Sequence, residues 1–199
     1  MNIKIIEPCS FDKRYEFRSL TPNLGPITIA SLLKAEGHDC QVISEYVTKM
    51  NLAEVKEADV VGISITTYNA NRGFEIARRV DKPVVFGGFH ASLMPEECLQ
   101  YGDYVIRGDG YPVVQLVRAL ETGKTKDLSR IPNLVYKKDG RIVCNQQTSQ
   151  IIDIVPDFGL VKDYYRLSLN RLTRIPLLVN GSRGCHFDCT FCAIKEVYK

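Results

Sequence analysis

The chain has 199 residues, 45% of them hydrophobic and 25% charged, so it is large and apolar enough to bury a substantial core. The formal charge is +3, and no run of Lys or Arg interleaved with aromatic residues favours a nucleic-acid partner. The first residues turn polar too early for a signal peptide, and no apolar run approaches the length of a membrane span, so we expect a cytoplasmic protein without a membrane partner.

Strand-like and helix-like segments alternate from residue 3 to about residue 122. The strand-like segments are short apolar runs at 3–6, 40–43, 60–65, 83–86 and 104–106. Between them, apolar residues at helical spacing predict helices at 26–36, 74–80, 94–101 and 112–121. This alternation predicts an α/β fold with a five-stranded, parallel, doubly wound sheet of the Rossmann or flavodoxin type.

Three of the predicted strands end in polar or glycine-rich segments. In such sheets, ligands bind beyond the carboxyl ends of the strands, where the strand order reverses. Glycines let a backbone approach a ligand closely, and exposed amides and hydroxyls donate hydrogen bonds. The alternative is a set of ordinary tight turns. No G-x-G-x-x-G follows the first strand, which disfavours a nicotinamide cofactor.

Beyond residue 123, the sequence changes character. Two short apolar runs flank Asp139-Gly140, which predicts a β-hairpin, and residues 151–158 resemble an extended connector. A new strand is expected at 175–179, and it leads into a group of cysteines.

This group of cysteines, Cys185, Cys189 and Cys192, has the spacing C-x₃-C-x₂-C, with Gly184 just ahead of it. Thiolate is a soft ligand that favours iron–sulfur clusters, zinc or copper(I). A [4Fe–4S] cluster usually has four cysteine ligands. Three would leave one iron open for chemistry, by analogy with the open position of catalytic zinc sites. Zinc is the alternative, with His186 as an awkward fourth ligand.

The remaining cysteines are widely separated, and we do not expect any of them to be a ligand. Cys40 lies in a strand-like segment and Cys98 in a helix-like one, so both are expected to be small buried residues. His38, next to Gly37, is expected to face solvent at the end of a helix. For His90, a cofactor contact and a hydrogen bond that shapes its loop are both open.

The cysteine triplet resembles the C-x₃-C-x-φ-C signature of the radical SAM superfamily, with Phe191 as the aromatic residue. This resemblance implies a [4Fe–4S] cluster on the three cysteines and S-adenosylmethionine bound to the open iron. An electron from the cluster would cleave the sulfur–carbon bond of that molecule and release a 5′-deoxyadenosyl radical. Phe191 would lie beside the adenine.

The preceding part resembles the cobalamin (B12)-binding domain that stands in front of many radical SAM domains. The matching segments are Gly25-Pro26, 32–38, 61–64, 87–91 and 107–110. The resemblance implies that the strand exits surround cobalamin. The residues that it assigns to cobalamin are Ser64, Thr66, Thr67, Gly87, Gly88, His90, Gly108, Asp109 and Gly110.

Two departures from related sequences bear on this site. The D-x-H-x-x-G motif, which supplies a histidine to cobalt in other cobalamin proteins, is absent, because no histidine has an Asp two residues earlier. Histidine ligation of cobalt through that motif is therefore excluded. Phe89 and Tyr111 stand where relatives more often have Pro and Glu.

The resemblance implies three parts: a cobalamin-binding-like domain over 1–123, a connector with a hairpin over 124–172, and the start of a radical SAM partial (β/α) barrel over 173–199. A full barrel takes about 250 residues, so we expect a fragment or truncated product that is inactive alone. Its partners would be the missing C-terminal barrel and an electron donor such as flavodoxin or ferredoxin.

The function that this implies is the N-terminal part of a B12-dependent radical SAM methyltransferase or of an enzyme for a related radical transformation. One alternative is a radical SAM protein whose α/β domain has lost cobalamin and binds a substrate or docks a partner. A second is a non-enzymatic ligand-binding module with a zinc knuckle. A methylthiotransferase is disfavoured, since no second cysteine triad is present.

Overall fold

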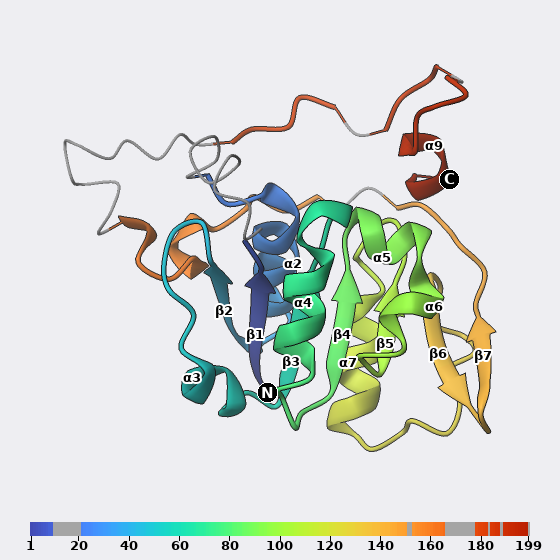
Figure 1. Cartoon of the computed structure of the whole chain (residues 1–199), viewed down its shortest axis with the longest axis horizontal. Helices are drawn as coiled ribbons and strands as arrows, with labels where there is room; N and C mark the ends of the chain where they lie inside the picture. Colours follow the sequence, from blue (N-terminus) through green and yellow to red (C-terminus); the bar gives the residue numbers. More distant parts are fainter. Residues whose placement is uncertain (10–20, 151–152, 166–177, 183, 188, 199) are drawn as a thin grey trace.

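A computed structural model describes residues 1–9, 21–150, 153–165, 178–182, 184–187 and 189–198. Its centre is a seven-stranded sheet in the order β2-β1-β3-β4-β5-β6-β7 (Figure 1). The strands are β1 (Asn2–Glu7), β2 (Asp39–Ser44), β3 (Val60–Ser64), β4 (Val84–Gly87), β5 (Tyr104–Ile106), β6 (Leu134–Lys138) and β7 (Arg141–Cys144). The α-helices are α2 (Leu24–Ala35), α3 (Leu52–Lys56), α4 (Ala70–Ala77), α5 (Phe89–Leu93), α6 (Pro95–Cys98), α7 (Val113–Glu121) and α9 (Ile194–Val197).

The first five strands are parallel, which confirms the predicted fold class. Ile5 of β1 pairs with Val42 of β2 on one side and with Gly62 of β3 on the other. The order 2-1-3-4-5 is the flavodoxin-like one, in which the chain changes its direction of travel across the sheet between β1 and β3. The carboxyl ends of these strands therefore share one edge, and a ligand is expected there, near the β1/β3 switch point.

Each face of the sheet has its own hydrophobic core, as a doubly wound sheet requires. On one face, α2 and α7 pack on the sheet through residues such as Ile27, Leu116 and Ile5. On the other, α4 and α6 pack through residues such as Phe74 and Cys98 in a cluster that includes Phe86 of β4. The rings of Phe74 and Phe86 meet edge to face, with centroids 5.7 Å apart. Burial on both faces explains why these strands are continuous apolar runs in the sequence.

The predicted hairpin exists, but it extends the sheet rather than standing apart from it. β6 runs antiparallel to β5, with Val105 opposite Val135, and β7 runs antiparallel to β6. Asp139 and Gly140 both have positive φ, 50° and 74°, as a two-residue type I′ turn demands. The expected five-stranded sheet was therefore incomplete. The hairpin covers the backbone edge that β5 would otherwise expose.

Other differences from the sequence expectations are local. α3 and α5 were not expected, because the first is a single short turn and the second follows directly on a glycine-rich strand exit. The expectation for His38 was wrong: its side chain is buried, with Nδ1 3.4 Å from the amino terminus of Met1. Cys40 and Cys98 are buried as expected.

The strand predicted at 175–179 falls largely outside the described residues, and 178–182 have no regular structure. Within the part of the chain that the structure describes, no helix has the length and apolar character needed to cross a bilayer.

Candidate cofactor site at the carboxyl edge of the sheet

The exits of β3 and β4 lie side by side at the carboxyl edge, because Ser64 pairs with Gly87 in the parallel register. Ser64 and Thr66 are half-buried, and Thr67 is exposed. The amide of Thr66 donates a hydrogen bond to Asn69 Oδ1 at 2.7 Å, and this bond caps the short 3-10 helix Thr67–Asn69. This part of the edge therefore presents hydroxyl groups from a fixed backbone.

The glycine pair after β4 has two different roles. Gly88 has φ +91°, and a Cβ there would stand 2.6 Å from the carbonyl oxygen of Ile65, so this position needs glycine for conformation and for space. The close approach lets the amide of His90 donate to the same carbonyl at 3.1 Å. Gly87 is open instead: among the described atoms, the nearest to an added Cβ is the Ile106 carbonyl oxygen at 4.0 Å.

His90 turns into the protein. Its side chain is buried, Nδ1 lies 3.3 Å from Thr67 Oγ1, and Nε2 lies 3.2 Å from a Glu97 carboxylate oxygen. Both ring nitrogens therefore have protein partners. Of the two roles that the sequence left open for His90, the geometry favours the hydrogen bond that shapes the loop.

The segment after β5 is packed against protein on several sides. Asp109 is only 4% exposed, and its carboxylate accepts a hydrogen bond from Ser149 Oγ at 2.6 Å. A Cβ on Gly110 would collide with the side chain of Ile29 in α2, and one on Gly108 would collide with the carbonyl oxygen of Val197 in α9. Sequence reasoning placed all three residues against the cofactor. In the structure, the Asp109 side chain faces other parts of the chain, and so would any side chain placed at Gly108 or Gly110.

The predicted residues thus fall into two groups. Those after β3 and at the end of β4 border the open edge: Ser64, Thr66, Thr67 and Gly87. The remaining residues shape the loops around it: Gly88, His90, Gly108, Asp109 and Gly110. The assignment of each to a cofactor stays a prediction, and the geometry favours the first group for direct contact.

Glu7 was missed by the sequence analysis. It ends β1 beside the switch point and is 1% exposed, with a carboxylate oxygen 3.1 Å from the backbone amide of Asn23 at the start of α2. The Asn23 side-chain amide donates to the same carboxylate. Burial raises the pKa of Glu7, and the hydrogen bonds from Asn23 oppose that rise. The available signal was an acidic residue directly after the apolar pair Ile5-Ile6 at the end of the strand.

We expect Glu7→Gln to stabilise the protein relative to wild type, increasingly so as the pH rises. A carboxyl group with a raised pKa in the folded state binds its proton more tightly there than in the unfolded chain. Wild-type stability should therefore fall as the pH rises from the unfolded pKa through the folded one, by about 1.4 kcal/mol for each unit between them. Urea denaturation of both proteins at a series of pH values from 4 to 8 measures the difference. A difference independent of pH would contradict this expectation.

The other side of the switch point is closed by a partly buried ion pair. Arg72 of α4 donates to both carboxylate oxygens of Glu45, which follows β2, with Nη2 2.6 Å from Oε1. The amide of Cys9 donates to the same carboxylate at 3.1 Å. This pairing raises the pKa of Arg72. It also ties the exit of β2 to α4 and compensates the charge of Glu45.

The cysteine loop lies beyond the same edge. Cys185 and Cys189 are exposed, Cys192 is half-buried, and the amide of Cys192 donates to the carbonyl of Cys189 at 3.1 Å. Phe191 is 91% exposed. Among the described residues, no group of three His, Cys, Asp or Glu side chains is close enough to hold a metal ion. The donor set of three accessible thiols in one loop still suits a soft metal centre. Binding would gather the thiols, so metal uptake and ordering of the loop would be coupled.

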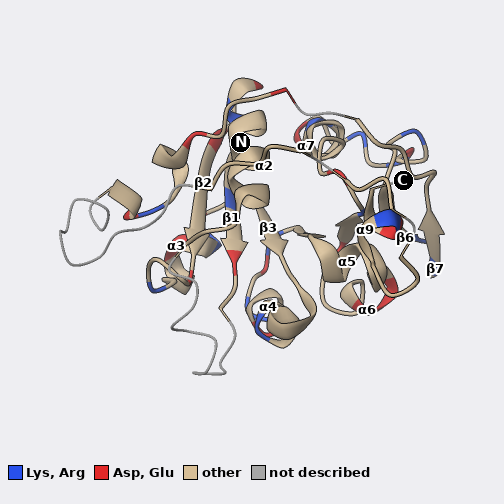
Figure 2. Ribbon diagram, turned by 90° about the horizontal axis from the view of Figure 1, so that it is seen from above, with Lys and Arg blue, Asp and Glu red and all other residues tan. Residues whose placement is uncertain are grey.

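α9 follows the cysteines and packs on the edge of the α/β domain (Figures 1 and 2). Val197 is 4% exposed, and the rings of Tyr198 and Phe89 meet edge to face, with centroids 6.4 Å apart. The helix that follows the three cysteines therefore lies against the same loops that sequence reasoning assigned to a cofactor.

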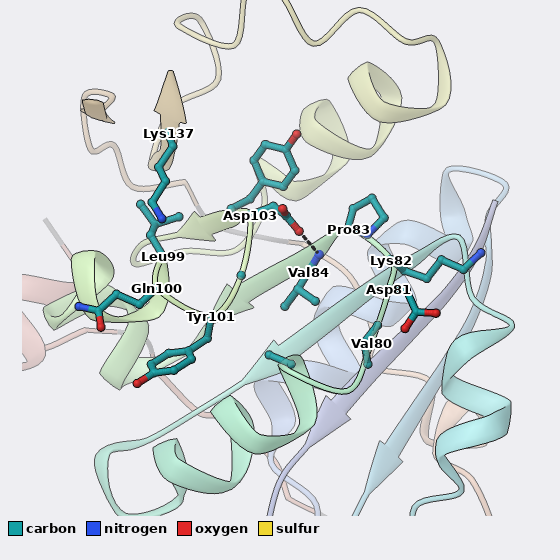
Figure 3. A pocket seen from close by; sticks show the side chains of 13 residues that line it. Val80, Asp81, Lys82, Pro83, Val84, Leu99, Gln100, Tyr101, Asp103 and Lys137 are labelled. Carbon is teal, nitrogen blue, oxygen red and sulfur yellow. Dashed lines mark hydrogen bonds between the residues drawn. The ribbon is translucent and has the colours of Figure 1, made fainter. Parts of the chain in front are cut away.

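An open cavity of about 520 Å³ lies at the opposite, amino-terminal edge (Figure 3). Its lining includes Pro83, Val84, Tyr101 and Lys137. Asp103 also lines it and accepts a hydrogen bond from the amide of Val84 at 2.8 Å. None of the residues predicted to bind a cofactor lines this cavity. The residues predicted from the sequence to bind cobalamin lie instead at the carboxyl edge.

The strand order and the open carboxyl edge define a ligand-binding domain of the flavodoxin-like class. A model of the B12 binding domain matches residues 15–117, and the chain belongs to this family. The sequence is 28% identical to an anaerobic magnesium-protoporphyrin IX monomethyl ester cyclase from Rubrivivax gelatinosus, over 97% of this chain and 38% of that protein. It is 33% identical to an uncharacterized methyltransferase from Pyrococcus horikoshii, over 86% of this chain and 40% of that protein. The chain spans about two fifths of these curated relatives.

Among solved structures, the fold is similar to that of the radical S-adenosylmethionine methyltransferase TsrM from Kitasatospora setae, solved with tryptophan substrate and a SAM analog. The TM-score is 0.68 at 18% identity, over 98% of this chain and 41% of TsrM. The cobalamin-dependent S-adenosylmethionine radical enzyme OxsB, solved with aqua-cobalamin and S-adenosylmethionine, gives a TM-score of 0.60 at 16% identity, over 75% of this chain and 22% of OxsB. These likenesses support the fold.

Proposed function

We propose that this chain is the cobalamin-binding region of a radical SAM enzyme that transfers a methyl group or carries out a related radical transformation. One observation carries the proposal: a B12-binding domain is followed in the same chain by a C-x₃-C-x₂-C loop, and the helix after that loop packs on the domain's carboxyl edge. Two separate cofactor signals thus meet at one edge.

The residues at this edge would have distinct roles. Ser64, Thr66, Thr67 and Gly87 would form the surface against which cobalamin lies, with hydroxyl groups to hydrogen-bond its amide arms. Cys185, Cys189 and Cys192 would hold a [4Fe–4S] cluster, and exposed Phe191 would stack on the adenine of S-adenosylmethionine. When bound, these groups supply radical initiation and a transferable methyl group, while the protein orients them and excludes water.

The names of the relatives support the enzyme class but leave the substrate open. They include a porphyrin ester cyclase, a bacteriochlorophyllide methyltransferase and uncharacterized methyltransferases. TsrM has been solved with both cobalamin and a [4Fe–4S] cluster. The chain covers between 28% and 40% of the length of these relatives. We therefore assign cofactor binding to this chain and catalytic turnover to the complete protein.

The direct test is to incubate the purified chain with hydroxocobalamin, desalt it, and record the absorbance spectrum. The expected result is about one corrin per chain. A spectrum without corrin bands would overturn the cobalamin assignment. It would favour the second candidate, a radical SAM protein whose α/β domain binds substrate or docks a partner. That candidate has one specific observation in its favour, namely that His90 and Asp109 already have protein partners.

We also expect that neither histidine of the α/β domain, His38 or His90, coordinates cobalt. His90 has both ring nitrogens occupied, and buried His38 lies beside Met1, at the amino-terminal edge of the sheet. In the cob(II)alamin-loaded His186→Ala chain, whose remaining histidines are these two, labelling histidine with ¹⁵N should leave the electron paramagnetic resonance spectrum unchanged. Unlabelled protein is the control. A change in the nitrogen superhyperfine splitting would show histidine ligation and contradict this expectation.

A further inference from the structure

The contact between α9 and the α/β domain is made by groups from three parts of the chain. Gln147, which follows β7, donates from Nε2 to the carbonyl oxygens of Glu196 and Val197, at 3.2 and 3.0 Å. The Val197 carbonyl also lies over Gly108, where any side chain would collide with it. Phe89 of α5 meets the ring of Tyr198. One small interface therefore joins three parts of the chain. They are the segments after β4 and β5, the segment after β7, and the helix α9 that follows the cysteine loop.

α9 needs this interface to exist as a helix. It spans only Ile194–Val197, and isolated helices of this length are unstable in water, because nucleation costs more than a few hydrogen bonds return. Two carbonyls in its last turn accept hydrogen bonds from the Gln147 side chain, which satisfies acceptors that a helix end leaves unpaired. Buried Val197 supplies the apolar contact.

The interface also fixes one end of the cysteine loop. Cys192 is two residues before α9, and Gly184, just before Cys185, has φ +75° and lies close to Tyr198, whose Cβ is 3.8 Å from where a Gly184 Cβ would stand. Both ends of the loop thus meet the docked segment. The position of α9 on the domain therefore sets where the three thiols lie relative to the carboxyl edge.

We propose that Gly108 and Gln147 are positioning residues, which dock the cysteine loop on the carboxyl edge rather than contacting cobalamin. This rests on the proposed function only in that the docked loop is taken to carry a cluster. Gly108 leaves the space that the Val197 carbonyl fills, and Gln147 holds that carbonyl in place. The distance between cluster and corrin would then depend on two residues that touch neither.

Hydrogen exchange on the cofactor-free complete chain tests the docking. In α9, the amides of Val197 and Tyr198 donate to the carbonyls of Ala193 and Ile194. In Gly108→Ala and in Gln147→Ala, we expect these two amides to exchange at least about tenfold faster than in wild type, because an undocked short helix opens freely.

Two matched controls separate docking from general loosening. Gly123 also has a positive φ, +66°, but an added Cβ there meets no described atom within 4 Å, so Gly123→Ala imposes similar backbone strain without touching α9. Gln146→Ala removes the exposed side chain next to Gln147. Both should leave the exchange of Val197 and Tyr198 unchanged. Equal exchange in all variants, or equal acceleration in the controls, would overturn the docking proposal.

A second readout uses the complete, cofactor-loaded enzyme. Gln147→Ala should keep its iron and corrin contents but change the magnetic coupling between the reduced cluster and cob(II)alamin in the electron paramagnetic resonance spectrum, since the cofactors would be present and misplaced. Unchanged coupling would overturn the positioning role. A chain that bound neither iron nor cobalamin would refute the proposed function. The hydrogen-exchange result would still test the docking proposal, because that experiment needs no cofactor.

Discussion

Replacing Cys185, Cys189 or Cys192 singly with alanine should abolish iron binding by the complete protein. With three protein ligands, the loss of any one leaves two thiolates, too few to retain a cubane cluster. We expect iron to fall from about four atoms per chain to fewer than about 0.5 after anaerobic reconstitution. Iron and acid-labile sulfide analysis, together with the visible absorbance, measures this.

Cys144→Ala is the matched control, because this thiol is also exposed but lies on β7, outside the loop. It should retain full iron content. Iron retained by all three loop variants would refute the cluster assignment. Bound zinc without acid-labile sulfide or visible absorbance in the wild type would favour the zinc-knuckle alternative. A fully protein-ligated cluster that ignores added S-adenosylmethionine would refute the radical mechanism while leaving the cobalamin assignment standing.

Introducing a large side chain at Gly87 should block cobalamin without unfolding the domain. Gly87 is the last residue of β4 and pairs with Ser64 of β3, and an added Cβ there lies no closer than 4.0 Å to a described atom, so the position has room for a phenylalanine at the expected corrin surface. We expect Gly87→Phe to weaken hydroxocobalamin binding at least about tenfold, which corresponds to about 1.4 kcal/mol. Absorbance after equilibrium dialysis measures the loss.

Gln115→Phe adds the same aromatic group at an exposed position of α7 and should bind cobalamin like wild type. Thermal unfolding of both variants separates blocking from misfolding. The expected midpoints lie within a few degrees of wild type, since phenylalanine is favourable in strands and an exposed substitution on α7 changes stability little. Normal binding by a folded Gly87→Phe protein would contradict the placement of the corrin at this edge.

The elements that the sequence predicts well are those whose burial is uniform. β3 and β4 read as continuous apolar runs because helices cover both faces of the sheet, so their pattern reflects one simple cause. The pairing of the hairpin with β5 could not be read in this way. It depends on which strand edge is free once the sheet has formed, and that is a property of contacts between residues 105 and 135 rather than of either segment alone.

Contacts between distant residues also limited what the sequence could predict about the candidate site. Reasoning from strand exits predicts the edge, and the nine residues predicted to contact cobalamin lie at or just after the ends of β3, β4 and β5. Whether a given side chain faces outward was not predictable, because its partner is remote in sequence: Thr67 for His90, and Ser149 for Asp109. Glu7 was overlooked because its burial depends on Asn23, which is remote in sequence. Only the structure shows that the Asn23 amide donates a hydrogen bond to the Glu7 carboxylate.

The hairpin has a practical consequence for anyone dividing this protein into pieces. Asn133, just before β6, donates from Nδ2 to the carbonyl of Asp109, and Ser149, beyond β7, holds the Asp109 carboxylate. A clone that stopped at residue 123 would therefore lose both hydrogen bonds to the loop after β5 and expose the β5 backbone edge, which favours self-association. The smallest portion that keeps the carboxyl edge intact should extend through Ser149, so trimming the domain at the family boundary of residue 117 would cut too soon.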